Sequence, residues 1–339
     1  MKIGVDLGTK NIIVYADPKG IVADFPCVIA FDTNEGKIIT IGENAQKMIG
    51  RNPSSMKLIR PLIDGAVSDF DSLESLLRYI MKTTCKNAVI KPKIAVSRPC
   101  SISGFEEAML KKIALSAGAR QALIVDEAVA AIIGAGVDVS RPEGNLVVDI
   151  GGGYTNIAVV TMGQIAKSTT IKNGGNRFDS AIQGYIKRKY NVLIGELSAE
   201  ETKKSIGGVL PRENEMAYVI KGQSVQTGFP VNVEVSSTEL CPILSGIADS
   251  ITFGIKQLLE STPPQLVADI YQNGVILTGG GALLHGIDAY LQQELKIPVR
   301  VAENPSECVA RGMKYFLDNY EKIINSDYSY DERGALCFE

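Results

Sequence analysis

A strand, a glycine turn and a second strand occur together twice in this chain, and this repeat constrains the fold more than any other feature of the sequence. The first unit spans Lys2–Tyr15 and the second spans Asn145–Val160. In both units an apolar strand ends at an aspartate, and a second β-rich strand follows the turn. These aspartates, Asp6 and Asp149, lie 143 positions apart, close to the roughly 150 residues of one domain. The duplication predicts two similar lobes that face each other across a cleft.

Composition argues against several classes of protein. The 339 residues include 35 basic and 38 acidic side chains, so we expect no nucleic-acid partner. No apolar run approaches the roughly 20 residues that cross a bilayer. Met1–Asp6 enters a strand at once, which we interpret as leaving no room for a signal peptide. With one histidine, His285, and no tryptophan, we expect neither a Ser/His/Asp triad nor a multi-histidine metal site.

The cysteines indicate a reducing cytosol. They are widely spaced and include no Cys-x-x-Cys pair, so we expect isolated thiols rather than a disulfide framework or a zinc site. The six residues are Cys27, Cys85, Cys100, Cys241, Cys308 and Cys337.

Strands and helices alternate along the chain. Apolar residues at helical spacing predict a helix that opens at Asp71–Leu73, and Ser103 with Glu106 forms the capping box of another. The alternation predicts an α/β fold with mixed sheets. The remaining expectations are strands at Lys93–Ser97 and Ala122–Val125, helices at Arg177–Tyr190 and Thr238–Ser261, a strand from Asn273 into a glycine turn, a helix from Ala282, and a mobile tail at 326–339.

Three glycine turns each follow an apolar strand. Because glycine lacks a Cβ atom, the amide groups of such a turn can approach a phosphate closely. For any single turn an ordinary hairpin explains the glycine equally well, since glycine is the usual turn residue. Three such turns at strand ends favour a bound nucleotide. They comprise Gly8, Thr9 and Lys10; Gly151, Gly152 and Gly153; and Gly279, Gly280 and Gly281.

Three acidic residues accompany these turns. Asp6 and Asp149 end strands directly before a turn, and their carboxylates would repel a polyphosphate unless Mg²⁺ lay between them. The alternative is that each caps its turn as an Asx residue, although their parallel placement favours the metal. Glu127 opens a helix after the strand that ends at Val125, where it either suits the helix dipole or orients a water molecule toward a γ-phosphate. Spacing alone does not separate it from Asp126.

At this point the chain resembles the superfamily of actin, sugar kinases and DnaK chaperones, and most closely the bacterial actin MreB family. The resemblance extends from the first residues to about Asn319. The glycine motifs belong to the superfamily, whereas the Arg-Pro-Leu and Tyr-Asn-Val-Leu-Ile-Gly-Glu segments point to MreB-like proteins. The matching segments are Asp6–Asn11, Ile59–Gly65, Asp149–Gly153, Lys189–Glu196, Val233–Ser237 and Leu277–Leu284.

The resemblance implies an actin-like fold, a duplicated ribonuclease H-like architecture with mixed sheets flanking a nucleotide cleft. Lobe I would comprise residues 1–144 and about 309–325, with a small subdomain at about 31–64. Lobe II would comprise 145–308, with a small subdomain at about 178–240. The resemblance also implies ATP or ADP with Mg²⁺, slow ATP hydrolysis coupled to assembly, and head-to-tail protofilaments paired antiparallel on the inner membrane, where they organise cell-wall synthesis with its membrane proteins and maintain cell shape.

By position, the resemblance also implies roles for individual residues. Asp6 and Asp149 would lie on the metal side, Glu127 would orient water, and Thr155 would lie near the active site. Glu200 and Lys203 would hold the adenosine, with Gly279–Gly281 behind it, and Asn11 would belong to the first nucleotide-binding turn. The chain departs from the usual family pattern at Ala128, Tyr154, Asn176, Arg177 and Ser205. We expect these departures to affect hydrolysis rate and nucleotide preference more than binding.

A short apolar pair predicts a membrane contact. Val89 and Ile90 are flanked by Lys86, Lys91 and Lys93, so they could insert weakly into an anionic lipid surface, strengthened by polymer avidity. An ordinary strand entry with solvated lysines explains them equally well. For the whole chain, the alternatives to a filament protein are an actin-fold metabolic kinase and a non-polymerising scaffold or chaperone-type ATPase.

Overall fold

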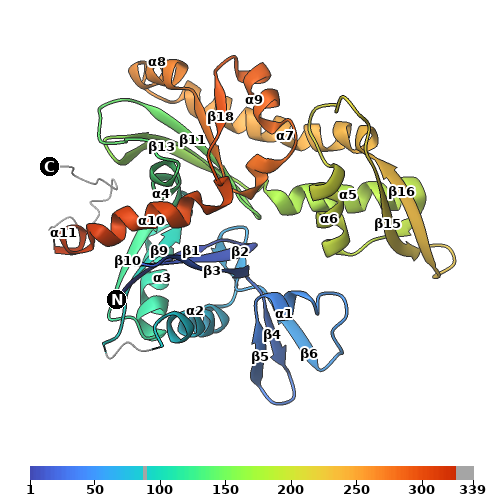
Figure 1. The fold of residues 1–339 in the computed structure, drawn as a ribbon, viewed down its shortest axis with the longest axis horizontal. Helices are drawn as coiled ribbons and strands as arrows, with labels where there is room; N and C mark the ends of the chain where they lie inside the picture. Colours follow the sequence, from blue (N-terminus) through green and yellow to red (C-terminus); the bar gives the residue numbers. More distant parts are fainter. Residues whose placement is uncertain (87–89, 326–339) are drawn as a thin grey trace.

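Two five-stranded sheets with the same strand order form the centre of the molecule (Figure 1). The computed structural model describes residues 1–86 and 90–325. In each sheet the two strands of the predicted hairpin pair antiparallel, and two further strands add in parallel on one side. The first sheet has the order β10 (Gln121–Asp126), β9 (Lys93–Arg98), β1 (Lys2–Leu7), β2 (Asn11–Ala16), β3 (Gly20–Pro26); the second has the order β13 (Gln164–Ile171), β12 (Thr155–Thr161), β11 (Asn145–Ile150), β17 (Val275–Thr278), β18 (Val299–Val301). The predicted duplication therefore extends from the hairpins to whole sheets.

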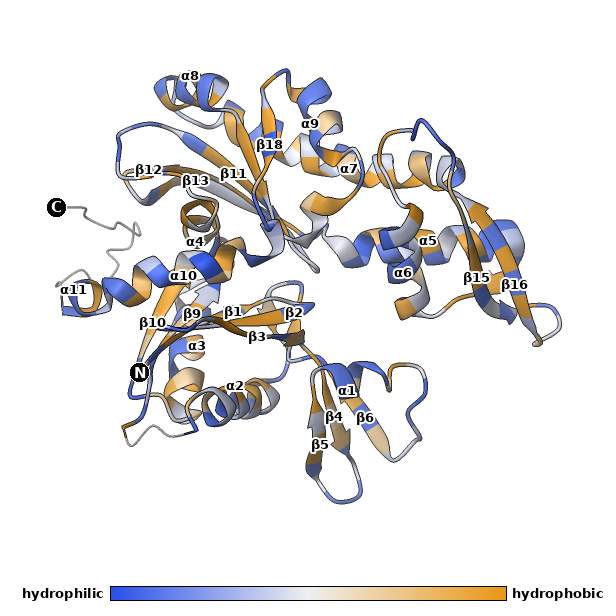
Figure 2. Ribbon diagram, in the orientation of Figure 1, coloured by the Kyte–Doolittle hydropathy of each residue, from blue (hydrophilic) through white to orange (hydrophobic). Residues whose placement is uncertain are grey.

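Two helices lie between the sheets. Figure 1 shows α4 (Glu127–Gly134) and α10 (Cys308–Asp318) in this position. Their buried side chains form one apolar cluster with residues of both sheets, among them Val125 and Val147. Figure 2 shows hydrophobic residues along α4, β9 and β10. This shared core joins the two lobes at one side of the cleft.

The outer faces of the sheets are covered by other helices. On the first sheet, the apolar face of α2 packs into the core with strand residues such as Ile3 and Val5. The capping box of Ser103 and Glu106 is confirmed. The outer helices are α2 (Phe70–Thr84) and α3 (Gly104–Ser116) on the first lobe, and α7 (Ser237–Glu260), α8 (Pro264–Asn273) and α9 (Ile287–Leu295) on the second; α11 (Tyr320–Asn325) follows α10.

A smaller three-stranded sheet projects from each large one (Figure 1). The first has the order β5-β4-β6 and the second has the order β14-β15-β16. Figure 1 shows both projections on the same side of the molecule. The first contains β4 (Ile29–Asp32), β5 (Lys37–Ile41), α1 (Glu43–Gln46) and β6 (Met56–Ile59), followed by the pair β7 (Leu62–Ile63) and β8 (Ala66–Val67); the second contains α5 (Gly175–Tyr190), β14 (Val192–Leu193), α6 (Glu196–Ile206), β15 (Ala217–Ser224) and β16 (Pro230–Ser236).

One predicted helix is wrong. The chain does not enter an α-helix at Ala282; it forms a 3-10 turn, η1 (Gly280–Leu283), and α9 begins only at Ile287. His285 interrupts the helix because it forms a β-bridge with Gly208, and Gly286 then adopts a left-handed conformation with a φ of 76°. A second 3-10 turn, η2 (Pro305–Glu307), precedes α10.

Two predictions involve residues outside the described part of the chain. The tail at 326–339, with Cys337, is one of them, and Val89 of the apolar pair is the other. Among the described residues, no helix is both long and apolar enough to cross a membrane.

Candidate functional site

A cavity of about 720 Å³ lies between the lobes where the three glycine turns meet. This volume is within the range of small-molecule and cofactor sites. Of the predicted site residues, Gly153 and Thr155 are not among those that line it. The predicted residues that do line it are Asp6, Gly8, Thr9, Lys10, Asn11, Glu127, Asp149, Gly151, Gly152, Glu200, Lys203, Gly279, Gly280 and Gly281.

Steric crowding explains why glycines occupy the turns. A Cβ atom on Gly8 would lie 2.5 Å from the carbonyl oxygen of Asn11, and one on Gly152 would lie 2.5 Å from Cβ of Lys10. Gly279 has a φ of 78°, and a Cβ there would lie 2.4 Å from the carbonyl oxygen of Ile150. The second turn therefore packs against the first and the third too closely for a side chain at Gly152 or Gly279.

Two of the predicted amide donors are already engaged. The amide of Gly151 donates to the carbonyl of Tyr154 at 3.0 Å, and that of Gly279 donates to Pro305 at 2.8 Å. These two bonds shape the turns instead of leaving the amides for a ligand. Anion binding through the second and third turns would accordingly involve neighbouring amides such as those of Gly152 and Gly280.

Three carboxyl groups face the cavity, and burial raises the pKa of each of them. Burial, with the nearby charge of Asp149, raises the pKa of Asp6 to about 7. Burial raises the pKa of Asp149 to about 6, against a hydrogen bond of 3.1 Å from the Thr278 hydroxyl. Burial and the charges of both aspartates raise the pKa of Glu127 well above its usual range. A cation between these groups would reverse the effect.

The donor set fits Mg²⁺ better than a metal held by protein ligands alone. Among the described residues, no group of three or more histidine, cysteine or acidic side chains is placed to hold a metal. Mg²⁺ takes oxygen ligands, keeps several waters and needs only one or two carboxylates. Asp6 and Asp149, which stand at equivalent strand ends, supply two carboxylates.

The structure separates Glu127 from Asp126. Glu127 begins α4 and lines the cavity. Asp126 lies outside the cavity lining, and its Oδ1 pairs with Nη2 of Arg98 at 3.0 Å. Of these two residues, only Glu127 is placed to face a bound ligand.

Sequence reasoning did not identify the residues that hold Glu127. The Tyr154 hydroxyl donates to both carboxylate oxygens at 2.8 Å, and the Asn156 side-chain amide donates to Oε2 at 2.7 Å. Ser97 Oγ lies 3.3 Å from Oε1. The one sequence signal was Tyr154, which departs from the usual family pattern.

Thr155 is turned away from the cavity. Its side chain is fully buried, and its hydroxyl donates to the Asn173 carbonyl at 2.5 Å. Gly153 packs against Thr9, since an added Cβ would lie 2.8 Å from the Thr9 Oγ1. Of the departures from the family pattern, Tyr154 and Asn176 line the cavity, whereas Ala128, Arg177 and Ser205 do not.

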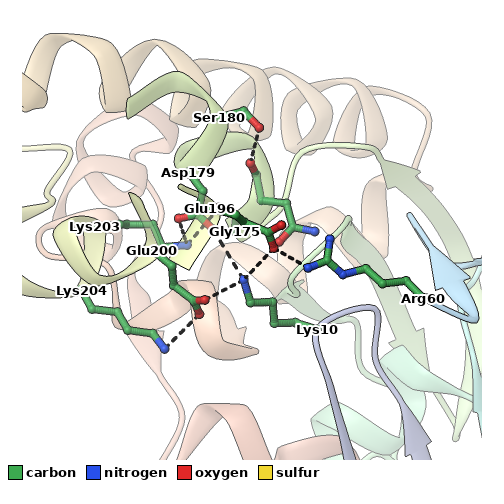
Figure 3. Close-up of polar contacts among 10 residues, drawn as sticks. Lys10, Arg60, Gly175, Asp179, Ser180, Glu196, Glu200, Lys203 and Lys204 are labelled. Atoms are coloured by element: carbon green, nitrogen blue, oxygen red, sulfur yellow. Dashed lines mark hydrogen bonds and ion pairs between the residues drawn. The ribbon is translucent and has the colours of Figure 1, made fainter. Parts of the chain in front are cut away.

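Charged side chains join the lobes at the cavity mouth (Figure 3). Lys10, in the first glycine turn, places its Nζ 2.7 Å from Glu200 Oε2 and 3.8 Å from both Asp179 and Glu196. Arg60 adds a second link, with Nη2 2.6 Å from Glu196 Oε1. We call these five residues the interlobe cluster. All three acids come from α5 and α6, so each of these contacts crosses the cleft.

The two residues assigned to adenosine are already paired. Lys203 Nζ lies 2.8 Å from Asp179 Oδ1 and donates to the Gly175 carbonyl at 3.0 Å. Glu200 pairs with Lys204 as well as Lys10, and the pKa of Glu200 is lowered: burial would raise it, but hydrogen bonds and charges from the two lysines outweigh burial. A ligand that uses Glu200 or Lys203 must exchange these partners.

Of the apolar pair Val89 and Ile90, only Ile90 lies within the described residues. The side chain of Ile90 is 63% exposed. Of the lysines expected beside it, Lys93 is paired with Glu321 of α11. Exposure of Ile90 agrees with either a lipid contact or a solvated loop.

Comparison with known proteins identifies close relatives over nearly the whole chain. The family model described as MreB/Mbl protein matches residues 1–325. The cell shape-determining protein Mbl of Bacillus cereus is 44% identical over 322 residues, which cover 95% of this chain and 97% of that protein. The cell shape-determining protein MreB of Escherichia coli is 37% identical over 316 residues, 91% of each chain.

Solved structures agree with these relatives. The crystal structure of MreB5 of Spiroplasma citri bound to ADP has a TM-score of 0.92 and 34% identity, and the match covers 96% of this chain and 98% of that one. Its form bound to AMPPNP has a TM-score of 0.91, covering 95% and 97%. The fold of the present chain is therefore actin-like, as expected.

Proposed function

Because this chain belongs to the MreB/Mbl family, we propose that it is an actin-like cytoskeletal protein that binds ATP, assembles into filaments and takes part in determining cell shape. The observation that carries the proposal is the convergence of three glycine turns and three acids on one cavity between two duplicated lobes. Relatives with bound ADP and AMPPNP support a nucleotide in this place. Their adenine nucleotides make ATP the first ligand to test.

The cavity residues suggest how the chain would treat ATP. Amides of the first two turns would contact the phosphates, and Glu200 and Lys203 would reach the adenosine after exchanging their present partners. Asp6 and Asp149 would hold Mg²⁺, which supplies positive charge against the phosphates when bound. Glu127 would orient the attacking water, and slow hydrolysis would be coupled to filament assembly.

We extend the proposal to the membrane surface. Exposed Ile90, beside Lys91, supports a weak lipid contact that many subunits of a filament would multiply. The filament would then lie at the inner face of the membrane, pair with a second protofilament, and meet the membrane proteins that synthesise the cell wall.

Sedimentation tests the proposal. The purified chain should pellet with ATP and Mg²⁺, show filaments in the electron microscope, and pellet more completely with anionic vesicles. Asp149→Ala, which removes one metal-side carboxylate, should suppress phosphate release. An Ile90→Ser variant should lose vesicle binding but keep its polymers. ATP turnover without polymers under any salt or lipid condition would favour a metabolic kinase or a scaffold ATPase of the same fold.

A further inference from the structure

The Tyr154 hydroxyl lies directly against the carboxylate of Glu127. Its oxygen is 2.8 Å from Oε1 and 2.8 Å from Oε2, so the phenol sits across the end of the carboxylate. Both side chains are buried, and both also line the cavity. The phenol therefore occupies a position from which a water molecule would otherwise hydrogen-bond to Glu127.

Three side chains occupy the space around the Glu127 carboxylate. An ionised carboxylate offers about four lone-pair sites. The Tyr154 hydroxyl has one proton and shares it between both oxygens, Asn156 donates to Oε2, and the Ser97 hydroxyl, 3.3 Å from Oε1, also lies 3.1 Å from Asp6 Oδ1. A water molecule that is to reach both carboxylate oxygens from the side of Tyr154 must displace the phenol.

Of the three partners, Tyr154 is the one whose loss exposes most of the Glu127 carboxylate. Asn156 is fixed at its other end, because its Oδ1 accepts from the Thr170 hydroxyl at 2.7 Å. Ser97 is fixed too, because its Oγ accepts from the Leu7 amide at 2.8 Å. Tyr154 spans both carboxylate oxygens with one hydroxyl, and rotation or displacement of this single group exposes both.

The tyrosine ring is held by its surroundings. A Cβ atom on Gly65 would lie 2.8 Å from the Tyr154 ring and 2.9 Å from Pro99. Gly65 has a φ of 83°, in the turn between β7 and β8. The ring thus fits into a space that a glycine leaves open, and the hydroxyl is aimed at Glu127 by packing.

We propose that Tyr154 is a positioning residue that restrains Glu127 and slows ATP hydrolysis at this site. The inference rests on the proposed function. In hydrolysis, water forms a bond to the γ-phosphorus as the bond to the β–γ bridging oxygen breaks, giving ADP, inorganic phosphate and a proton. Tyr154 acts before this step, by occupying the carboxylate that would orient the water. Filaments would consequently stay longer in the ATP state.

Tyr154→Phe tests the inference, because it removes the hydroxyl and keeps the ring. Losing one hydrogen bond to a charged group should raise kcat for phosphate release by about tenfold. KM for ATP and the Kd for AMPPNP should be unchanged, and filaments formed with ATP should disassemble sooner while AMPPNP filaments should not. Tyr185→Phe is the matched control, since Tyr185 also donates to a carboxylate, that of Glu239, away from the cavity. Tyr185→Phe should leave kcat, KM for ATP, the Kd for AMPPNP and filament disassembly unchanged.

A double variant shows whether Tyr154 acts through Glu127. In a Glu127→Gln background, Tyr154→Phe should have no effect on the residual rate. Unchanged or lowered kcat in Tyr154→Phe, with a melting temperature like that of the original chain, overturns the inference. The same increase in the Glu127→Gln background also overturns it. Absence of nucleotide binding by the original chain would instead refute the proposed function itself.

Discussion

At the scale of single residues, the cavity concentrates negative charge. Asp6, Asp149 and Glu127 reach it from β1, β11 and α4, and each has a raised pKa. Groups that bind a cation or orient water must face the ligand, and they repel one another until the ligand arrives. Burial of these three acids therefore lowers the stability of the fold at neutral pH.

Asp149→Asn should stabilise the nucleotide-free protein. The pKa of Asp149 is about 6 in the native state, above its ordinary 3.8. Between these pH values the native state binds more protons than the unfolded state, so the free energy of unfolding falls as pH rises. Asparagine removes this loss, and its side-chain oxygen can still accept from the Thr278 hydroxyl. The substitution should therefore add about 3 kcal/mol to the free energy of unfolding at neutral pH.

Thermal unfolding without nucleotide measures the effect. The melting temperature of Asp149→Asn at neutral pH should rise by about 4 °C, and its dependence on pH between about 4 and 6 should flatten. Glu303→Gln, at an exposed acid, is the control and should follow the original chain. A lower melting temperature for Asp149→Asn at neutral pH would contradict the electrostatic argument.

The positions of some site residues were predictable from the sequence, because chain order alone determines them. Asp6 and Asp149 follow apolar strands and precede glycines, so their place at strand ends could be read directly. The hydrogen bonds from Tyr154 and Asn156 to Glu127 could not be predicted. These two residues lie 27 and 29 positions from Glu127 in the sequence and meet it only after two sheets have packed around α4. The same holds for Arg60 and Glu196, which are 136 positions apart.

At the scale of elements, α4 and α10 cross at very short range. A Cβ atom on Gly134 would lie 1.8 Å from the Cys308 carbonyl oxygen, and one on Gly312 would lie 1.9 Å from the Ala130 carbonyl oxygen. Each helix thus presents a glycine to the backbone of the other. This contact fixes the separation of the two sheets, because both helices lie between them.

Gly312→Ala should destabilise the protein strongly. The added methyl group cannot fit against a backbone carbonyl, so the helices must move apart at a cost of about 3 kcal/mol. Gly246→Ala is the control, since Gly246 lies in α7 with open space around its Cβ position. It should gain about 0.5–1 kcal/mol from helix propensity. Chemical denaturation measures the free energy of unfolding of both variants. Equal stability of Gly312→Ala and Gly246→Ala would show that α4 and α10 leave room for a methyl group between them.

Periodicity and caps predicted most elements but not this crossing. Apolar spacing and the Ser103 capping box located α2 and α3 because such signals are local. The missing helix at Ala282 shows the limit, since the β-bridge from His285 to Gly208 joins segments 77 positions apart. Helix–helix distances depend in the same way on partners that the local pattern does not contain.

At the scale of the whole molecule, two of the links between the lobes lie on different sides of the cavity. One is the apolar joint that α4 and α10 form on one side of the cavity. The interlobe cluster links the other side through Lys10 and Arg60. Because Glu200 is also a predicted nucleotide contact, this charged link and the ligand compete for the same carboxylate.

Lys10→Ala should therefore widen the cleft of the nucleotide-free protein. Loss of the 2.7 Å contact to Glu200 leaves Arg60 as the remaining link across the mouth within the cluster. Small-angle scattering should show a radius of gyration about 1 Å above the roughly 20 Å expected for this length.

About 1 M salt, at which charges are screened beyond about 3 Å, should widen the cleft of the original chain similarly and affect the variant less. AMPPNP with Mg²⁺, by bridging the lobes itself, should remove the difference. Lys314→Ala breaks an ion pair that lies within α10 and should leave the scattering unchanged. If Lys10→Ala and Lys314→Ala scatter alike, the apolar joint alone sets the cleft, and the interlobe cluster has no part in holding it closed.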